Sequence, residues 1–128
     1  MAAWRLLMVG LRQSREALRI RLADRARAML AGGLMEEVRR LWAAGYRESL
    51  PVMNGIGYRQ FGAALRGELT EAEALRLMTR DTVRYAKRQM TWFARDPEIR
   101  WIDVDAAGGL TGAAEAIVTQ VMKEGLIE

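Results

Sequence analysis

Cysteine and histidine are both absent from this 128-residue chain. Without cysteine there is no disulfide and no thiol chemistry, and without either residue the usual ligands of a zinc site are missing. Histidine-based acid–base catalysis is excluded for the same reason. A chain of this composition is compatible with a reducing compartment, and we expect it to be cytoplasmic.

A long apolar run that could cross a membrane is also absent. The most apolar stretch, residues 1–11, is interrupted by Arg5, is followed by no small-residue cleavage site and is far too short to span a bilayer. We therefore expect no membrane association. Hydrophobic residues make up 51% of the chain and charged residues 28%, which is enough to bury the core of one domain. No repeat or composition shift marks a boundary, so residues 1–128 are treated as a single piece.

A phosphate-binding loop is the third absence. Glycines cluster near positions 32, 55 and 108, but none of these clusters continues into the Lys-Ser/Thr pair that completes Gly-x-x-x-x-Gly-Lys-Ser/Thr. A transferase that handles phosphates with such a loop would have to obtain it from elsewhere.

The secondary structure expected is mainly α-helical with two short strands. Residues 6–9 form a continuous apolar run typical of a buried parallel strand, and residues 100–104 form a second strand after the helix-ending Pro97. Two strands alone do not make a stable sheet covered on both faces, so the chain is expected to belong to a larger fold. Ser14 and the Thr70/Glu73 capping box start two of the helices, and glycines stop others. The predicted helices cover residues 15–31, 34–44, 58–66, 71–95 and 111–123.

The longest predicted helix has one basic face and one apolar face. No acidic residue occurs between Thr82 and Arg95, so the basic face has no oppositely charged neighbour on its own helix. A phosphate-rich partner would neutralise this face, whereas a solvated charged face is the commoner explanation for an arbitrary amphipathic helix. On a 3.6-residue period the basic side carries Arg80, Arg84, Lys87, Arg88, Thr91 and Arg95, and the apolar side carries Leu75, Met78, Thr82, Ala86, Met90 and Phe93.

Two strings in the chain resemble signatures of one family. Residues 85–93, Tyr-Ala-Lys-Arg-Gln-Met-Thr-Trp-Phe, resemble a signature near the C-terminal end of the tRNA dimethylallyltransferases, also called tRNA isopentenyltransferases, and residues 54–60, Asn-Gly-Ile-Gly-Tyr-Arg-Gln, resemble a second one. The resemblance runs from about residue 11 to residue 101 and covers only the C-terminal part of the family. It implies the C-terminal portion of an α/β P-loop-type transferase fold, with the phosphate loop and the catalytic aspartate in an N-terminal half that this sequence does not contain. Val83 and Ala94 depart from the pattern, because arginines are common at both places.

The resemblance also implies a reaction. Family members transfer a dimethylallyl group from dimethylallyl pyrophosphate to the exocyclic amine of the adenosine 3′ of the tRNA anticodon, with Mg²⁺, whose ligands are not expected in this chain. The implied partners are the tRNA anticodon arm, dimethylallyl pyrophosphate and the missing N-terminal half. The isolated chain is expected to be inactive and to self-associate through exposed apolar faces. A non-catalytic RNA-binding module, or a structural subunit that completes a separate catalytic half, is the alternative.

The resemblance assigns two sets of site residues, and no catalytic residue. Arg21 and Arg25, one helical turn apart, would face the pyrophosphate, although a pair of surface arginines, one of them neutralised by Asp24, explains the spacing equally well. The 54–60 segment alone could be an ordinary loop-to-helix turn, and Trp92 could pack rather than stack on a base. Asp103 and Asp105 are given no metal-binding role. The residues expected to bind tRNA are Asn54, Gly57, Tyr58, Arg59, Gln60, Arg84, Lys87, Arg88, Gln89, Thr91 and Trp92.

Overall fold

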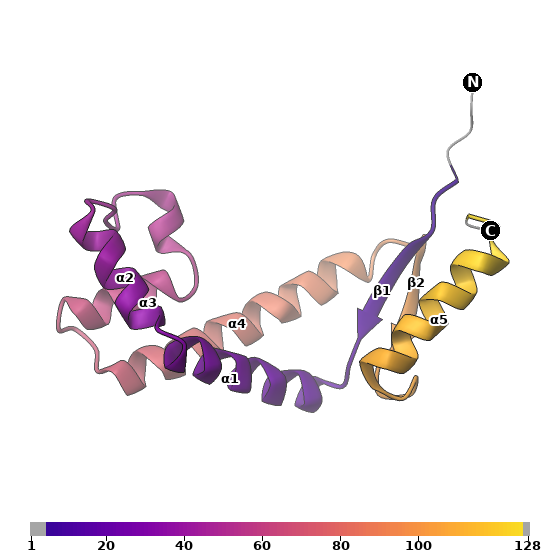
Figure 1. Ribbon diagram of the computed structural model, residues 1–128, viewed down its shortest axis with the longest axis horizontal. Coiled ribbons are helices and arrows are strands. Elements are labelled where there is room, and N and C mark those ends of the chain that lie inside the picture. The colour runs from indigo at the N-terminus through magenta and orange to yellow at the C-terminus, as the bar shows by residue number, and fades with distance from the viewer. Residues whose placement is uncertain (1–4, 127–128) are drawn as a thin grey trace, which may run out of the picture. The chain divides into compact units, whose positions relative to one another are not determined.

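The computed structural model describes residues 5–126 and confirms a mainly helical chain with two parallel strands (Figure 1). The first residues of the apolar opening segment, 1–4, lie outside the described part. The elements in chain order are β1 (Met8–Arg12), α1 (Arg15–Ala31), α2 (Leu34–Ala43), the 3₁₀ helix η1 (Pro51–Asn54), α3 (Tyr58–Leu65), α4 (Glu71–Phe93), β2 (Ile99–Asp103) and α5 (Gly109–Lys123).

The chain divides into two compact units, which are described separately. One unit, called the helical unit below, is Arg19–Arg88. The other, the sheet unit, combines the described residues of Met1–Leu18 with those of Gln89–Glu128. The division falls inside α1 and α4, so each of these helices contributes residues to both units.

In the sheet unit, β1 and β2 pair in parallel and α5 packs against β2 (Figure 1). The strand expected at residues 6–9 is found two residues later, because its extent depends on the backbone of β2: Met8 pairs with Ile99 and Arg12 with Asp103. Position 10 of β1 is a glycine, and a Cβ there would come within 2.6 Å of the Trp101 ring, so a larger residue would not fit beside β2. An apolar run therefore located this strand but not its limits.

Part of the exposed surface of α5 is apolar. Ala113 is buried against β2 together with Ile102, while Leu110, Val118 and Met122 are exposed. These three residues share one side of the helix, since they are separated by multiples of four. Exposed apolar residues of this kind are the reason for expecting the isolated chain to self-associate. Self-association stays a prediction.

The helical unit is organised around Phe61 and Val38, whose side chains are fully buried. Phe61 lies on α3, and α2 packs against α3 so that Val38 and Leu34 cover it. Ala26 of α1 and Met78 of α4 complete the buried cluster. The core thus holds α1, α3 and α4 together where the candidate site lies.

Local capping signals placed the starts of α1 and α4 correctly, whereas the last helix, expected from residue 111, begins at Gly109. Ser14 Oγ accepts the Ala17 N–H at 3.2 Å at the start of α1. At the start of α4, Glu73 Oε2 accepts the Thr70 N–H at 2.7 Å and Thr70 Oγ1 accepts the Glu73 N–H at 3.2 Å, so the capping box is confirmed. The segment between α2 and α3 contains η1, and Pro51 occupies the first position of that turn with a backbone angle suited to it.

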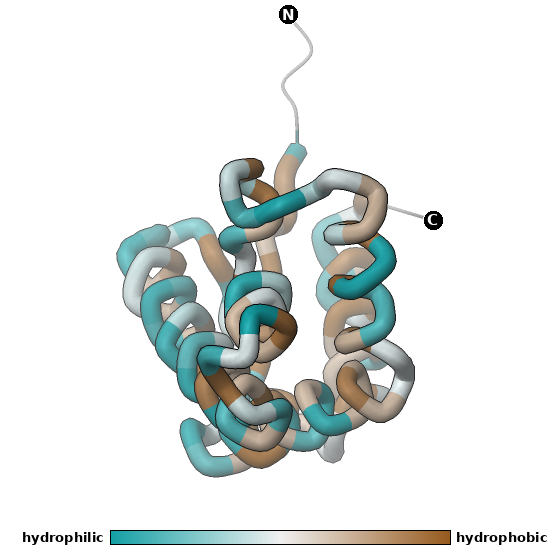
Figure 2. Tube along the Cα trace, turned by 90° about the vertical axis from the view of Figure 1, so that its left-hand side faces the viewer, coloured by the Kyte–Doolittle hydropathy of each residue, from teal (hydrophilic) through white to brown (hydrophobic). Residues whose placement is uncertain are grey.

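The hydropathy of the helices is mixed along their length. Figure 2 shows hydrophilic and hydrophobic positions alternating along the chain. Among residues 5–126, no helix has both the length and the apolar character needed to cross a membrane.

Candidate functional site

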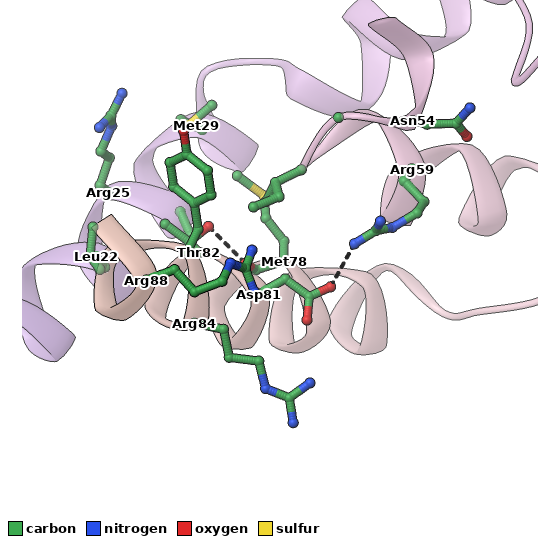
Figure 3. Close-up of a pocket in the computed structure, with 14 residues that line it drawn as sticks. Leu22, Arg25, Met29, Asn54, Arg59, Met78, Asp81, Thr82, Arg84 and Arg88 are labelled. Atoms are coloured by element: carbon green, nitrogen blue, oxygen red, sulfur yellow. Dashed lines mark hydrogen bonds and ion pairs between the residues drawn. The ribbon is translucent and has the colours of Figure 1, made fainter. Parts of the chain in front are cut away.

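An open pocket of about 710 Å³ lies in the helical unit, and we call it the arginine pocket (Figure 3). Residues from α1, from the segment before α3, from the start of α3 and from α4 form its wall. The lining residues are Leu22, Arg25, Ala26, Met29, Asn54, Gly55, Ile56, Arg59, Met78, Asp81, Thr82, Arg84, Tyr85 and Arg88.

The lining combines strong positive charge with apolar surface. The lining contains four arginines and a single carboxylate, that of Asp81. Apolar side chains from both long helices, including Leu22, Met29 and Met78, lie beside them. Guanidinium groups bind phosphate oxygens through two N–H groups at once, and an apolar wall suits a flat or hydrocarbon group. The pocket therefore fits a ligand that carries both phosphate and an apolar or aromatic part.

The two arginines of α1 that were predicted to face the pyrophosphate are placed differently. Arg25 lines the arginine pocket, whereas Arg21 is exposed and is not part of the lining. Asp24, which could have neutralised either of them, pairs with Arg27 instead. The structure thus brings only one of the two predicted pyrophosphate-facing residues to the pocket.

Hydrogen bonds within the protein stabilise the turn before α3. Gly57 has φ = 98°, a conformation that favours glycine, and its N–H donates to Gln60 Oε1 at 2.7 Å. Gln60 is only 4% exposed, and its Nε2 donates to Asp81 Oδ2 at 2.8 Å. The oxygen and the nitrogen of the Gln60 amide therefore both form hydrogen bonds within the protein. Gln60 and the buried Gly57 therefore shape the turn and present little surface to a partner.

The other residues of the 54–60 segment divide between interior and surface. The Tyr58 hydroxyl donates to the Glu37 carboxylate, and this hydrogen bond, assisted by burial, raises the pKa of Tyr58 above its usual value. Asn54 Nδ2 donates to the Glu48 carbonyl at 2.9 Å and its side chain is exposed at the pocket edge. Arg59 Nη2 pairs with Asp81 Oδ2 at 2.9 Å. Of the 54–60 segment, Asn54, Ile56 and Arg59 are the side chains that line the pocket.

Asp81 lines the pocket but was not among the predicted site residues. It accepts hydrogen bonds from Arg59, Gln60 and, at 2.9 Å, from Arg80 Nε. Burial by itself raises the pKa of this carboxyl group, but the hydrogen bonds from Arg80, Arg59 and Gln60 outweigh that effect and hold the pKa below its usual value. One signal was visible: Asp81 is the last acid before the basic stretch, three and seven residues ahead of Arg84 and Arg88.

The basic face of α4 contributes Arg84 and Arg88 to the pocket. The Arg88 guanidinium lies 5.8 Å from the centroid of the Tyr85 ring, close enough for a cation–π contact. Arg84 extends away from Arg25 and Arg88 in Figure 3. Lys87 is exposed but is not a lining residue.

The last predicted tRNA-binding residues lie at the C-terminal end of α4, within the sheet unit. Gln89, Thr91 and Trp92 are all exposed there. Trp92 is 69% exposed, and its ring centroid is 5.1 Å from that of Phe93. Within residues 5–126 it is therefore a surface side chain, and packing into a core does not explain it.

No metal site is formed by the part of the chain that is described. Residues 5–126 contain no group of three or more Asp, Glu, His or Cys side chains placed to hold a metal ion. Asp103 Oδ1 accepts the backbone N–H groups of Asp105 and Ala106 at 3.1 and 3.0 Å, which is an ordinary turn role.

Comparison with known proteins relates this chain to one family. A family profile described as IPP transferase matches residues 1–96. The chain is 47% identical over 118 residues to a tRNA dimethylallyltransferase of Desulforudis audaxviator, covering 92% of the chain and 38% of that protein. It is 48% identical over 109 residues to one from Syntrophobacter fumaroxidans, covering 85% of the chain and 32% of the relative.

Two solved structures are similar as well. A tRNA delta(2)-isopentenylpyrophosphate transferase from Staphylococcus epidermidis matches with a TM-score of 0.83 and 32% identity over 91% of this chain and 38% of that one. A full-length tRNA isopentenylpyrophosphate transferase from Bacillus halodurans matches with a TM-score of 0.78 and 31% identity, covering 94% of this chain and 40% of that one. The chain thus spans 32 to 40% of the length of these four proteins.

Proposed function

The chain belongs to the IPP transferase family, and on that basis we propose that it supplies the tRNA-binding and pyrophosphate-facing side chains of a tRNA dimethylallyltransferase. The reaction proposed is transfer of a dimethylallyl group from dimethylallyl pyrophosphate to the exocyclic amine of the adenosine 3′ of the anticodon. The observation that carries the proposal is the arginine pocket, in which four arginines lie beside apolar side chains.

In this proposal Arg25 faces the leaving group. The amine nitrogen bonds to the first carbon of the dimethylallyl group while the bond from that carbon to the pyrophosphate oxygen breaks, and negative charge develops on the pyrophosphate. A guanidinium placed there stabilises the charge as it forms. Bound Mg²⁺ would neutralise the same phosphates, but the described residues hold no carboxylate cluster for it, so no Mg²⁺ ligand is assigned to this chain. The phosphate loop and the base that takes the amine proton would come from a further part of the enzyme.

The tRNA contacts proposed are Asn54 and Arg59 at the pocket edge and the exposed cations of α4. The target adenosine has to leave its stack before its amine can react, so the protein must hold a distorted anticodon loop in place. Phosphate contacts provide that hold without requiring a particular base sequence. We place the reaction in the cytoplasm.

The first test measures the dependence of RNA affinity on salt. Arg88→Ala should weaken binding of an anticodon stem-loop RNA and reduce the slope of log affinity against log salt by roughly 0.7 to 0.9 for each phosphate that the variant no longer neutralises. Fluorescence anisotropy over a salt series provides the slope. The matched control is Arg39→Ala, which removes the same charge from an exposed arginine of α2 that pairs with Glu36, outside the pocket. An equal reduction of the slope in both variants would show that RNA does not select the α4 surface.

The second test asks whether Trp92 contacts RNA. Because its side chain is 69% exposed, Trp92→Ala should leave the melting temperature nearly unchanged. If a base stacks on it, the variant should lose about 1 to 3 kcal/mol of RNA affinity. Trp42→Ala is the matched control, since Trp42 packs against the buried core and its truncation should lower the melting temperature. A Trp92 variant that melts early but binds RNA normally would refute the stacking role.

A further inference from the structure

Three side chains place donors within hydrogen-bonding distance of the Asp81 carboxylate. Its Oδ2 accepts from Arg59 Nη2 at 2.9 Å and from Gln60 Nε2 at 2.8 Å, and its Oδ1 accepts from Arg80 Nε at 2.9 Å. The Asp81 side chain is only 14% exposed, whereas that of Arg59 is 53% exposed. A largely buried carboxylate of α4 therefore holds a surface arginine that belongs to α3.

The same carboxylate also acts on the turn before α3. Gln60 donates to Asp81 through Nε2 and accepts the Gly57 N–H through Oε1, so the orientation of its amide is determined at both ends. Loss of Asp81 would leave the buried Gln60 Nε2 without its partner, which is unfavourable inside a protein. Asp81 thus links α4 to the conformation of the 54–60 segment.

Arg59 keeps donors available for a ligand. Among the residues that the structure describes, it bonds to Asp81 through Nη2 alone, and a guanidinium has five N–H groups. The side chain lines the arginine pocket, where Figure 3 shows it joined to Asp81 by a dashed line. An arginine held in one orientation before binding loses less conformational entropy when a phosphate arrives.

We propose that Asp81 is a positioning residue for RNA binding, which holds Arg59 at the edge of the arginine pocket and fixes the 54–60 turn beside it. This rests on the proposed function, in which Arg59 contacts RNA phosphate. The opposite effect follows if Asp81 acts only through its charge: a carboxylate beside phosphate-binding arginines repels RNA, so its removal should strengthen binding. Positioning and simple charge therefore predict opposite signs.

The experiment measures anticodon stem-loop affinity by fluorescence anisotropy, with the folded state checked by circular dichroism. Arg59→Ala should weaken binding by about tenfold, as expected for one charge-assisted hydrogen bond. Asp81→Ala should weaken binding to a similar extent, although it makes the chain more positive. The double variant Asp81→Ala/Arg59→Ala should bind no more weakly than Arg59→Ala alone, because both changes act on the same interaction with RNA.

Two further variants separate positioning from charge. Asp81→Asn keeps an oxygen that can accept hydrogen bonds from Arg59 and Gln60. Its RNA affinity should therefore be much closer to that of the wild type than the affinity of Asp81→Ala is. Asp24→Asn makes the same change of charge at an exposed aspartate of α1 that pairs with Arg27, outside the pocket lining, and its affinity should be unchanged or slightly higher. If Asp81→Ala is too unstable to assay, Asp81→Glu replaces it: the charge stays but the carboxylate moves by one methylene, so positioning predicts weaker binding and charge alone predicts no change.

The outcomes distinguish the inference from the function on which it rests. If the wild-type chain shows no salt-dependent RNA binding, the proposed function fails and the positioning role fails with it. If Arg59→Ala weakens binding while Asp81→Ala, or Asp81→Glu in its place, binds as tightly as wild type or more tightly, the positioning role is refuted and the function stands. If Arg59→Ala has no effect, Arg59 does not contact RNA and the positioning role is likewise refuted.

Discussion

Replacement of Arg25 by alanine should lower the rate of prenyl transfer by about 10²- to 10³-fold, the loss typical of removing one group that stabilises transition-state charge. Arg25 is the α1 arginine that lines the arginine pocket. In the proposed reaction, charge on the pyrophosphate oxygen grows as its bond to the dimethylallyl carbon breaks, so a guanidinium there would act mainly in the transition state. The affinity for tRNA should therefore change by less than about threefold, because ground-state binding of tRNA does not depend on that charge.

The measurement is single-turnover prenylation of tRNA by a chimera in which this chain replaces the 118 matched residues of the Desulforudis audaxviator relative. Arg21→Ala, one turn earlier on α1 and outside the pocket lining, should have the smaller effect of the two. Arg27→Ala is the matched control, since Arg27 pairs with Asp24 on the exposed side of the helix. If the rate and tRNA affinity fall in parallel in Arg25→Ala, the residue binds tRNA rather than the leaving group.

Replacement of Phe61 by alanine should lower the free energy of unfolding by about 3 to 5 kcal/mol, the usual cost of emptying the place of a fully buried aromatic side chain. Phe61 has 0% exposure and lies in the cluster formed with Val38, Ala26 and Met78. These neighbours come from α1, α2 and α4, so the space left by Phe61 would lie between three helices. Urea unfolding followed by circular dichroism gives the value.

The control for Phe61 is Tyr85→Ala, which truncates an aromatic side chain that is half exposed on α4. It should cost much less stability, because most surface substitutions change the free energy of unfolding by about 0.5 kcal/mol or less. Phe61→Ala should also weaken RNA binding at temperatures where it stays folded, since α3 carries Arg59 and Gln60. Equal stability losses in both variants would mean that the core is not centred on Phe61.

Local sequence was sufficient to identify the helices and where two of them begin. The caps at Ser14 and at Thr70 with Glu73 act through bonds to backbone groups within four residues, so they can be recognised without knowing the rest of the fold. The basic face of α4 likewise follows from periodicity, which is a property of one helix. The two signature strings indicated the family, and the matching profile and relatives bear that out.

Tertiary structure decided how the predicted site residues divide between surface and interior. Arg21 and Arg25 are equivalent in sequence spacing, yet only Arg25 lines the pocket. Gln60 was predicted to contact tRNA, but it is buried and its amide donates to Asp81 of α4. Asp81 itself carries no signal that a neighbour on α3 would bind it, because Arg59 and Gln60 lie 22 and 21 residues away along the chain. Contacts of that range depend on which helix faces pack together, and that is determined by the burial of Phe61 and its neighbours rather than by any local pattern.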